Sequence, residues 1–347
     1  GAGKSLCFQV PALVLGGLTI VVSPLVALMS DQVAALKLAG VEAETINSSR
    51  EREDNVASWQ RVASGHVPIL YMAPERLMDG RMMAALAKLP ISLFAVDEAH
   101  CISQWGPAFR PEYAQLSILS ERFPDVPIAA MTATADEATR RDIEIQLFSG
   151  ASKTFVHGFD RPNISIEVRS KADWQRQLLD FIIPKKGQNG IVYCLSRKKT
   201  EETAELLNTN GILALPYHAG LEKTVRAHHQ DRFVTEAGLV MVATIAFGMG
   251  IDKSDVRFVF HTDLPASIEA YYQEIGRAGR DGEEARAMML FGPADIAMRR
   301  RFIENDGADE DNKRRQHKRL DMFIAFADAI TCRRQILLQY FGEPSQA

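Results

Sequence analysis

The sequence predicts an α/β protein with two tandem parallel-sheet lobes and a short C-terminal helical segment. Short apolar and β-branched runs alternate with helix-like stretches through most of the 347 residues, which is the pattern of parallel strands joined by helices. Turn-forming residues interrupt the alternation at 158–163, and strand patterns end after Asp295. We therefore expect lobe 1 at residues 1–157, lobe 2 at 158–296 and the helical segment at 297–347.

Lobe 1 is expected to begin with a helix at 6–15. Its strands are predicted at 19–23, 67–72, 91–96 and 127–131, and Gly40 ends a helix that starts near Pro24. The charge-free stretch 10–29 is long enough to span a bilayer, but two prolines and two glycines divide it. We interpret it as a helix end, a turn, a buried strand and a new helix, and we predict no membrane span.

Lobe 2 repeats the alternation of lobe 1 without repeating its sequence. Its strands are predicted at 164–168, 191–194, 213–217, 239–242 and 256–260. Helices are expected at 199–208, 222–236 and 267–276, and in the C-terminal segment at 299–304 and 321–340. A charged stretch, 305–319, lies between the last two. Its basic part, 313–319, is either a phosphate-binding patch or a solvated loop or helix face, and the residues alone leave both open.

Composition limits the function classes without selecting one. The chain has 46% hydrophobic and 24% charged residues, enough to bury ordinary cores. A net charge of −4 and a pI near 6.1 give no whole-protein electrostatic case for nucleic-acid binding, so any such case must be local. The 4 cysteines are far apart and form no C-x-x-C pair. This spacing argues against a disulfide framework and a closed zinc site, and it favours a reducing compartment.

The N-terminus carries a phosphate-binding pattern. Gly1-Ala2-Gly3-Lys4-Ser5 matches the last five positions of G-x-x-x-x-G-K-[ST] and precedes the expected first helix. In such a loop the backbone and the helix N-terminus surround phosphate oxygens, Lys4 reaches the β and γ phosphates, and Ser5 ligates Mg²⁺. A flexible Gly-rich terminus is the alternative for these five residues alone. The strand that should feed the loop is not in the sequence, so we expect the sequence to be a fragment.

Two acids follow the apolar strand at 91–96 and so lie at the carboxyl end of a parallel strand, where α/β sheets bind ligands. Asp97 is suited to bind Mg²⁺, and Glu98 is suited to orient and polarise an attacking water. Together with the phosphate loop they favour nucleotide hydrolysis over a pair of solvated acids. Thr132 and Thr134 follow the last strand of lobe 1, where they form either hydrogen bonds to these acids or a helix N-terminus.

In lobe 2, Arg277 and Arg280 stand three residues apart between glycines. The permanent charge and planar donors of arginine suit the charge that develops on a γ-phosphate, and neighbouring glycines allow close backbone approach. Surface salt bridges are the alternative. The glycine-containing loop at 244–252 is able to face both a nucleotide and a nucleic-acid strand.

An aromatic stretch follows the two acids of lobe 1. Trp105 and Phe109 have helical spacing, but Pro107 and Pro111 disfavour a continuous helix, so we expect a loop that presents the two rings and Arg110. Bases stack on such side chains without regard to sequence, at about 1–3 kcal/mol per base. We interpret the stretch as a DNA-binding loop, with packing between the lobes as the alternative.

Taken together, these features resemble a RecQ-family DNA helicase of superfamily 2. The resemblance covers nearly the whole chain and rests on the segments 3–9, 22–25, 73–77, 97–105, 132–135, 246–253 and 273–282. It implies two RecA-like lobes, ATP and Mg²⁺ in a cleft, and 3′ to 5′ translocation along single-stranded DNA. The aromatic-rich loop after Asp97-Glu98-Ala99-His100 separates this family from RNA-remodelling relatives.

The resemblance also implies roles by matched position. The residues expected to bind and hydrolyse ATP are Lys4, Ser5, Asp97 and Glu98, with Arg277 and Arg280 completing the site from lobe 2. Further nucleotide contacts are expected from Gly1, Gly3, Gly248, Asp252 and Gln273. The residues expected to contact DNA are Ser23, Pro74, Arg76, Trp105, Phe109 and Arg110. Those expected to couple DNA to hydrolysis are His100, Gln104, Thr132 and Thr134.

Three features depart from the family pattern. Pro107-Ala108 stands where the family loop usually carries His-Asp. The adenine-reading segment is expected upstream of Gly1. Cys332 begins a stretch that resembles the start of the family's zinc module, whose other three cysteines would fall beyond Ala347. Because Cys332 alone cannot hold zinc, we expect Zn²⁺ in the full-length protein and none bound by the chain as given.

The expected function is that of an ATP-dependent 3′–5′ DNA helicase in DNA repair and recombination. Expected partners are single-stranded and forked DNA, single-strand-binding protein and other repair factors, with no membrane. We expect the cytoplasm, at the nucleoid, in a bacterium and the nucleus in a eukaryote. Two alternatives remain open, an RNA helicase or remodeller of superfamily 2 and a nucleic-acid-binding fragment without turnover.

Overall fold

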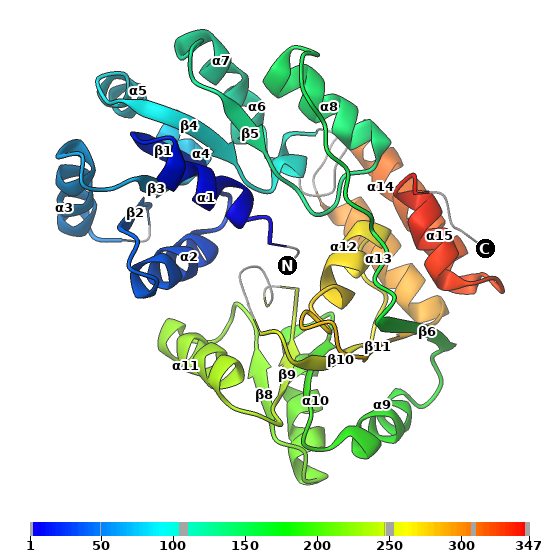
Figure 1. The fold of residues 1–347 in the computed structure, drawn as a ribbon. Helices are drawn as coiled ribbons and strands as arrows, with labels where there is room; N and C mark the ends of the chain where they lie inside the picture. The colour runs from blue at the N-terminus through cyan, green and yellow to red at the C-terminus, as the bar shows by residue number, and fades with distance from the viewer. Residues whose placement is uncertain are drawn as a thin grey trace. The chain divides into compact units, whose positions relative to one another are not determined.

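The computed structural model describes residues 3–48, 50–103, 110–245, 247, 253–306 and 310–343. The chain divides into two compact units between His157 and Gly158. The first unit contains lobe 1, and the second contains lobe 2 together with the C-terminal helices. Each unit is built around its own parallel sheet (Figure 1).

Five parallel strands form the sheet of lobe 1 in the order β2-β3-β1-β4-β5. They are β1 (Leu18–Val22), β2 (Ala43–Ile46), β3 (Ile69–Met72), β4 (Ile91–Val96) and β5 (Ile128–Ala130). Val22 pairs with both Met72 and Val96, so the three central strands end level with one another. Residues that follow these strands therefore gather at one edge of the sheet.

Helices cover both faces of the lobe 1 sheet. Successive strand residues point to opposite sides, so the continuous apolar runs give the sheet two apolar faces to bury. One face packs against α1 (Leu6–Val14) and α2 (Val26–Leu38) through residues such as Val21 and Tyr71. The other face packs against α3 (Arg52–Ala63), α5 (Gly80–Leu86) and α8 (Glu137–Phe148) through residues such as Val22 and Met72. The shorter helices of the lobe are α4 (Pro74–Leu77), η1 (Ala99–Ile102), α6 (Pro111–Ala114), η2 (Gln115–Ser117) and α7 (Ile118–Arg122).

Six parallel strands form the sheet of lobe 2 in the order β6-β11-β10-β7-β9-β8. They are β6 (Ile164–Ser170), β7 (Asn189–Tyr193), β8 (Ala214–Tyr217), β9 (Val240–Ala243), β10 (Val256–His261) and β11 (Ala285–Phe291). One face packs against α9 (Trp174–Ile182) and α10 (Arg197–Thr209), with η3 (Ile183–Lys185) following α9. The other face packs against α11 (Lys223–Thr235), α12 (Ile268–Ile275), α13 (Pro293–Asn305), α14 (Glu310–Asp328) and α15 (Arg333–Tyr340).

The predicted fold class is confirmed, and all nine predicted strands are present with ends that shift by about two residues at most. Two strands were not predicted. In β2 the polar Glu44 and Thr45 hide the strand pattern, although both are buried. In β11 the predicted helices on either side left 285–291 unassigned, yet this strand pairs with both β6 and β10.

The C-terminal helices differ from the predictions at 299–304 and 321–340, since α13 begins at Pro293 and α14 begins at Glu310. A single helix at 321–340 is wrong, because the chain breaks between Asp328 and Arg333 into α14 and α15. The basic stretch 313–319 lies inside α14, where Lys313 and His317 contact Glu304 at 3.9 and 2.7 Å. The stretch 313–319 is therefore part of a helix and not of a loop. Phosphate binding by this helix stays a prediction.

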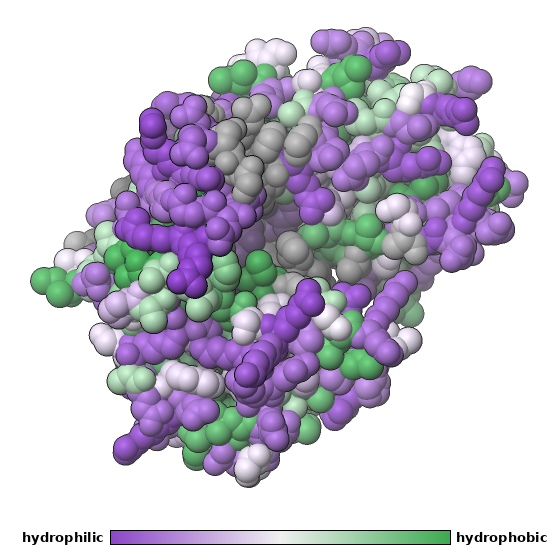
Figure 2. Space-filling view, turned by 180° about the vertical axis from the view of Figure 1, so that it is seen from behind, coloured by the Kyte–Doolittle hydropathy of each residue, from purple (hydrophilic) through white to green (hydrophobic). Residues whose placement is uncertain are grey.

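Within the described ranges, no helix is both long enough and apolar enough to cross a membrane. On the face drawn in Figure 2, hydrophilic residues predominate and hydrophobic residues form small separate patches.

Candidate functional site

The phosphate-loop residues of lobe 1 lead directly into α1. Gly3 has a φ of +70°, a left-handed backbone that glycine adopts without strain. The N–H groups of Leu6 and Gln9 donate to Gly3 O and Ser5 O, both at 2.9 Å, so helical bonding begins at once. The Ser5 side chain makes no capping hydrogen bond to this helix. Lys4 and Ser5 are half-buried, and Gly1 lies outside the described residues.

Asp97 and Glu98 lie where β4 ends, beside β1. The N–H of Asp97 donates to Val22 O at 2.9 Å, which fixes the acid at the carboxyl edge of the sheet. Burial and the neighbouring charge of Glu98 raise the pKa of Asp97 to about 6, although the positive charge of Lys4 opposes the shift. The phosphate-loop lysine therefore acts electrostatically on the acid expected to bind Mg²⁺. An adjacent pair of carboxylates that resist ionising together fits a divalent cation.

Glu98 has a left-handed backbone, with φ 49° and ψ 45°. This conformation is uncommon for a residue other than glycine and costs roughly 1–3 kcal/mol, and such positions concentrate at functional sites. The N–H of Glu98 donates to Asp97 Oδ1 at 2.9 Å. The turn therefore places the two carboxylates in fixed relation to each other.

His100 joins two of the predicted elements. Its Nδ1 lies 2.9 Å from Thr132 Oγ1 and 3.2 Å from Glu98 Oε2, and the ring is buried. The N–H of Thr134 in turn approaches Thr132 Oγ1 at 3.3 Å. The expected coupling residues of the β4 and β5 loops are thus in contact through one imidazole. Gln104 lies outside the described residues.

Sequence reasoning missed two tyrosines near these acids. The O–H of Tyr113 donates to the backbone carbonyl of Asp97 at 2.9 Å. The Tyr71 hydroxyl accepts a hydrogen bond from Gln9 Nε2 at 3.1 Å, and the negative charge of Asp97 reaches it. Burial raises the pKa of Tyr71 to about 12, so it stays protonated. Nothing in the sequence pattern around either tyrosine indicates a contact with Asp97.

The residues of lobe 1 that are expected to contact DNA differ in their exposure to solvent. Arg76 is exposed on α4, whereas Ser23 and Pro74 are buried. Arg110 is half-buried, and its N–H donates to Cys101 O at 2.9 Å. Trp105 and Phe109 lie outside the described residues. Among the described residues, only Arg76 and Arg110 therefore offer charge to a phosphate backbone from the predicted set.

The raised pKa of Asp97 predicts a conflict between stability and function. The pKa of Asp97 is higher in the folded state than in the unfolded state, so the free energy of unfolding falls as pH rises from about 4 to about 6. Above that range Asp97 is ionised in both states, and the full loss of stability is present. We expect Asp97→Asn to raise the Tm of the nucleotide-free protein at pH 7.5 by roughly 5 °C, and to abolish ATP hydrolysis. The gain should vanish near pH 4. Thermal unfolding at both pH values, with the exposed Asp125→Asn as control, checks this; a lower Tm at pH 7.5 would contradict it.

In lobe 2 the predicted arginines follow α12 directly. The N–H groups of Arg277 and Ala278 continue the helix for one more turn, and the N–H of Gly279 then donates to Val256 O at 2.9 Å. Arg277 and Arg280 are half-buried, and Gln273 is half-buried on α12 itself. The residues Gly248 and Asp252 lie outside the described part of the chain.

Tyr193, at the end of β7, lies beside this arginine loop. Burial raises the pKa of Tyr193 to about 12, and the positive charge of Arg277 partly opposes the shift. The tyrosine O–H donates to Phe247 O at 3.1 Å, and its ring stacks on His261 with 5.2 Å between centroids. His261 Nε2 lies 2.7 Å from Glu274 Oε2. The arginine loop therefore rests on a buried aromatic and charged layer that the sequence did not reveal.

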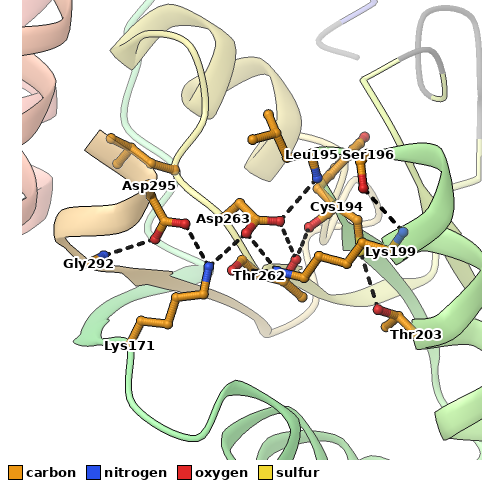
Figure 3. A network of polar contacts seen from close by, with 12 residues as sticks. Lys171, Cys194, Leu195, Ser196, Lys199, Thr203, Thr262, Asp263, Gly292 and Asp295 are labelled. Carbon is orange, nitrogen blue, oxygen red and sulfur yellow. Dashed lines mark hydrogen bonds and ion pairs between the residues drawn. The ribbon is translucent and has the colours of Figure 1, made fainter. Parts of the chain in front are cut away.

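A buried ion network ties the carboxyl end of the lobe 2 sheet to its helices (Figure 3). Asp263 Oδ1 contacts Lys171 Nζ at 2.7 Å and Lys199 Nζ at 2.6 Å, and Lys171 also contacts Asp295 at 2.7 Å. Burial alone would raise the pKa of Asp263, but the two ammonium groups outweigh it and hold that pKa well below its usual range. We call Lys171, Lys199, Asp263 and Asp295 the Asp263 network. It links β6, α10, β10 and α13.

Cys332 precedes α15 and is exposed. No group of three or more His, Cys, Asp or Glu side chains able to hold a metal ion occurs within the described ranges. Cys332, the predicted zinc ligand, therefore belongs to no such group among the residues that the structure describes.

Three family models match the chain in order. One described as DEAD/DEAH box helicase matches residues 1–143, one described as helicase conserved C-terminal domain matches 170–282, and one described as RecQ zinc-binding matches 293–347. The first covers the phosphate loop and both acids of lobe 1. The second includes both arginines of lobe 2, and the third includes Cys332.

Curated relatives resemble the chain along its whole length. A protein of Haemophilus influenzae named ATP-dependent DNA helicase RecQ is 47% identical over 346 residues, which is 100% of this chain and 56% of the relative. The protein of the same name from Bacillus subtilis is 41% identical over 99% of this chain and 58% of the relative. The chain thus spans somewhat more than half the length of these relatives.

Solved structures share the fold. Helicase Lhr of Mycobacterium smegmatis, bound to single-stranded DNA and AMP-PNP, superposes with a TM-score of 0.63 at 18% identity, covering 93% of this chain and 52% of that one. The helicase MrfA bound to DNA gives a TM-score of 0.67 at 18% identity, covering 88% of this chain and 47% of that one. At this identity the likeness establishes the fold alone, two RecA-like parallel-sheet lobes.

Proposed function

The chain belongs to the RecQ family of helicases, and we propose that it works as an ATP-dependent DNA helicase that moves along single-stranded DNA from 3′ to 5′. The observation that carries the proposal is the pair Asp97 and Glu98 at the end of β4, within the electrostatic reach of Lys4. The names of the curated relatives support DNA as the substrate. Polarity and a place in repair and recombination rest on the family resemblance alone.

Each lobe supplies a part of the chemistry. Lys4 and the backbone N–H groups of the phosphate loop bind the β and γ phosphates, and Ser5 with Asp97 would hold Mg²⁺, which neutralises phosphate charge. Glu98 orients the attacking water and accepts its proton as the bond from the γ-phosphorus to the β,γ-bridging oxygen breaks.

The family resemblance implies that the arginines of lobe 2 act on the same phosphoryl group. Arg277 and Arg280 stabilise the negative charge that builds up on its oxygens while the bond breaks, and release of phosphate removes the group that they bind. A hydrolysis cycle can therefore alternate the grip of the two lobes on DNA and move the protein along one strand.

His100 connects Glu98 to the loop that follows β5. Its Nδ1 lies close to both Glu98 Oε2 and Thr132 Oγ1, so loss of the γ-phosphate beside Glu98 would change the contacts of the loop that follows β5. The aromatic loop begins just after His100 in the sequence. Occupancy of that loop by single-stranded DNA would thereby change the position of Glu98, which couples DNA binding to hydrolysis.

Zinc belongs to the proposal for the whole protein. The match to a RecQ zinc-binding model over 293–347 supports one zinc site in the full-length protein, with Cys332 as one ligand and the other ligands beyond Ala347. Such a site would fix the chain that follows α15.

The choice between DNA and RNA tests the proposal. We expect single-stranded DNA to stimulate ATP hydrolysis by the full-length protein far more than RNA of the same sequence does. Replacing Trp105 and Phe109 together with alanine should reduce the DNA-stimulated rate at least about tenfold, because stacking contributes roughly 1–3 kcal/mol per base. Phe155→Ala, which removes an exposed aromatic ring elsewhere in lobe 1, is the control.

Three outcomes would decide against this proposal. Equal stimulation by RNA and DNA, or a DNA-stimulated rate that survives loss of both aromatic rings, would favour an RNA helicase. Tight DNA binding by the full-length protein without phosphate release would favour a binding module without turnover.

A further inference from the structure

The segment that opens lobe 2 contacts the arginine loop through one side chain. The guanidinium of Arg161 donates to the carbonyl oxygens of Ala278 at 3.0 Å and Gly279 at 2.9 Å, and approaches that of Gly276 at 3.5 Å. These carbonyls flank Arg277 and immediately precede Arg280. One arginine thus holds the backbone of the loop that presents the other two.

Asn163 closes the same loop from a second direction. Its side-chain Nδ2 donates to Gly279 O at 2.8 Å and to Glu283 O at 2.9 Å. Its main-chain carbonyl accepts a hydrogen bond from the N–H of Ala285 at 2.9 Å. Gly279 has a φ of +57°, and a Cβ there would lie only 2.4 Å from Asn163 Nδ2. The loop is therefore packed against Asn163 with no room for a side chain at its turn.

Arginine suits this position for electrostatic and geometric reasons. The last carbonyls of a helix have no partner within it, and a cation near this negative end is favourable. Gly276 is the C-terminal cap of α12, so Arg161 supplies both charge and donors there. The planar guanidinium can address three carbonyls at once, whereas a lysine ammonium carries one compact charge on a flexible stem.

The opening segment is itself held by α12 and α15. The Tyr272 O–H donates to Phe159 O at 2.7 Å, and the Phe159 ring stacks on Phe341 with 4.6 Å between centroids. Arg334 contacts Asp160 at 2.6 Å and donates to Ile164 O at 2.7 Å. Arg161 therefore extends from a backbone that is fixed on two sides.

We propose that Arg161 is a positioning residue that holds the Arg277–Arg280 loop in the conformation needed for ATP hydrolysis. This proposal rests on the function proposed above. Without Arg161, the released carbonyls turn toward water and the two loop arginines lose their fixed placement. The phosphate loop and the acids lie in lobe 1 and keep their geometry, so nucleotide still binds while the chemical step slows.

The test uses the full-length protein with saturating single-stranded DNA. Arg161→Gln should lower kcat for ATP hydrolysis by about 10- to 100-fold, as expected for small misplacement of a catalytic group. The KM for ATP should stay within about twofold of wild type, because binding energy common to ground and transition states is retained. Arg161→Lys should give an intermediate kcat.

Arg334→Gln is the matched control. It removes an arginine that bonds to Asp160, Pro162 and Ile164 in the same opening segment, rather than to the carbonyls of the arginine loop that Arg161 holds. We expect it to lower the Tm to a similar extent while kcat stays near wild type. Hydrogen exchange at residues 276–283 should quicken in Arg161→Gln and stay unchanged in Arg334→Gln.

Combining substitutions separates positioning from simple destabilisation. Since Arg161 acts through Arg277 and Arg280, adding Arg161→Gln to a variant that already carries Arg277→Ala and Arg280→Ala should cost little further rate. The proposal would be overturned if Arg161→Gln lowered kcat in the double-alanine variant by the same factor as in wild type. An equal loss of kcat in Arg334→Gln, or unchanged hydrogen exchange at 276–283 in Arg161→Gln, would also overturn it. If wild type and Arg161→Gln hydrolyse ATP equally fast, the positioning role of Arg161 is wrong, but the proposed function stands. If wild type shows no DNA-stimulated hydrolysis, the proposed function itself is wrong.

Discussion

Glu98→Gln is expected to reduce the DNA-stimulated rate of ATP hydrolysis by about 10²- to 10³-fold in the full-length protein, the scale that a general base contributes. Glutamine keeps the size of the side chain, but it cannot accept the proton of the attacking water. Because Lys4 and Ser5 are untouched, ATP should bind with nearly unchanged affinity. Single-turnover hydrolysis and equilibrium binding of ATP, measured on the same preparation, separate the two effects.

A matched variant controls for loss of charge in lobe 1. Glu121→Gln removes an exposed carboxylate from α7, and we expect it to hydrolyse ATP at the wild-type rate. If Glu98→Gln hydrolysed ATP within a few-fold of wild type, the role given to Glu98 would be wrong.

Asp263→Asn is expected to have the largest effect on stability. Among the described residues, it takes from Lys199 its carboxylate partner and from Lys171 one of two, although both lysine side chains are more than four-fifths buried. Removing one member of a buried ion network typically costs about 3–5 kcal/mol, because an uncompensated charge remains inside. Hydrogen exchange of β10 and α10 should report the loss, since Asp263 and Lys199 lie in or beside these elements.

The pH dependence of this effect follows from the pKa of Asp263. That pKa is lower in the folded state than in the unfolded state, so the network contributes fully above about pH 4 and loses its contribution as pH falls further. The difference between wild type and Asp263→Asn should therefore be constant near neutral pH and shrink in acid. Asp321→Asn, which removes the exposed partner of Arg300, should cost less than about 1 kcal/mol. Equal losses in the two variants would contradict the account.

Strands could be predicted from the sequence where burial alone determined the pattern of apolar residues. The strands with continuous apolar runs, such as β1 and β4, were predicted because burial on both faces leaves no polar positions. β2 was missed because Glu44 is buried and satisfied by Ser58, Lys37 and Arg61, contacts that come from α2 and α3. Local pattern cannot show that a distant helix will neutralise a strand carboxylate.

The candidate site divides in the same way. Residues with strong chemical signatures, such as Lys4, Asp97 and Arg277, could be named from spacing and residue type alone. Tyr113, Arg161 and Asp263 could not, because their roles depend on which backbone groups the folded chain brings to them. Arg161 lies in a turn that marks only a domain boundary in the sequence, yet its partners are more than 110 residues away.

Strand separation measured on tailed duplexes tests the helicase proposal most directly. With ATP and Mg²⁺, the full-length protein should unwind a DNA duplex that carries a 3′ single-stranded tail and leave one with a 5′ tail largely intact. Glu98→Gln should bind both duplexes and unwind neither. Unwinding without ATP, unwinding from the 5′ tail alone, or equal unwinding by Glu98→Gln would contradict the account.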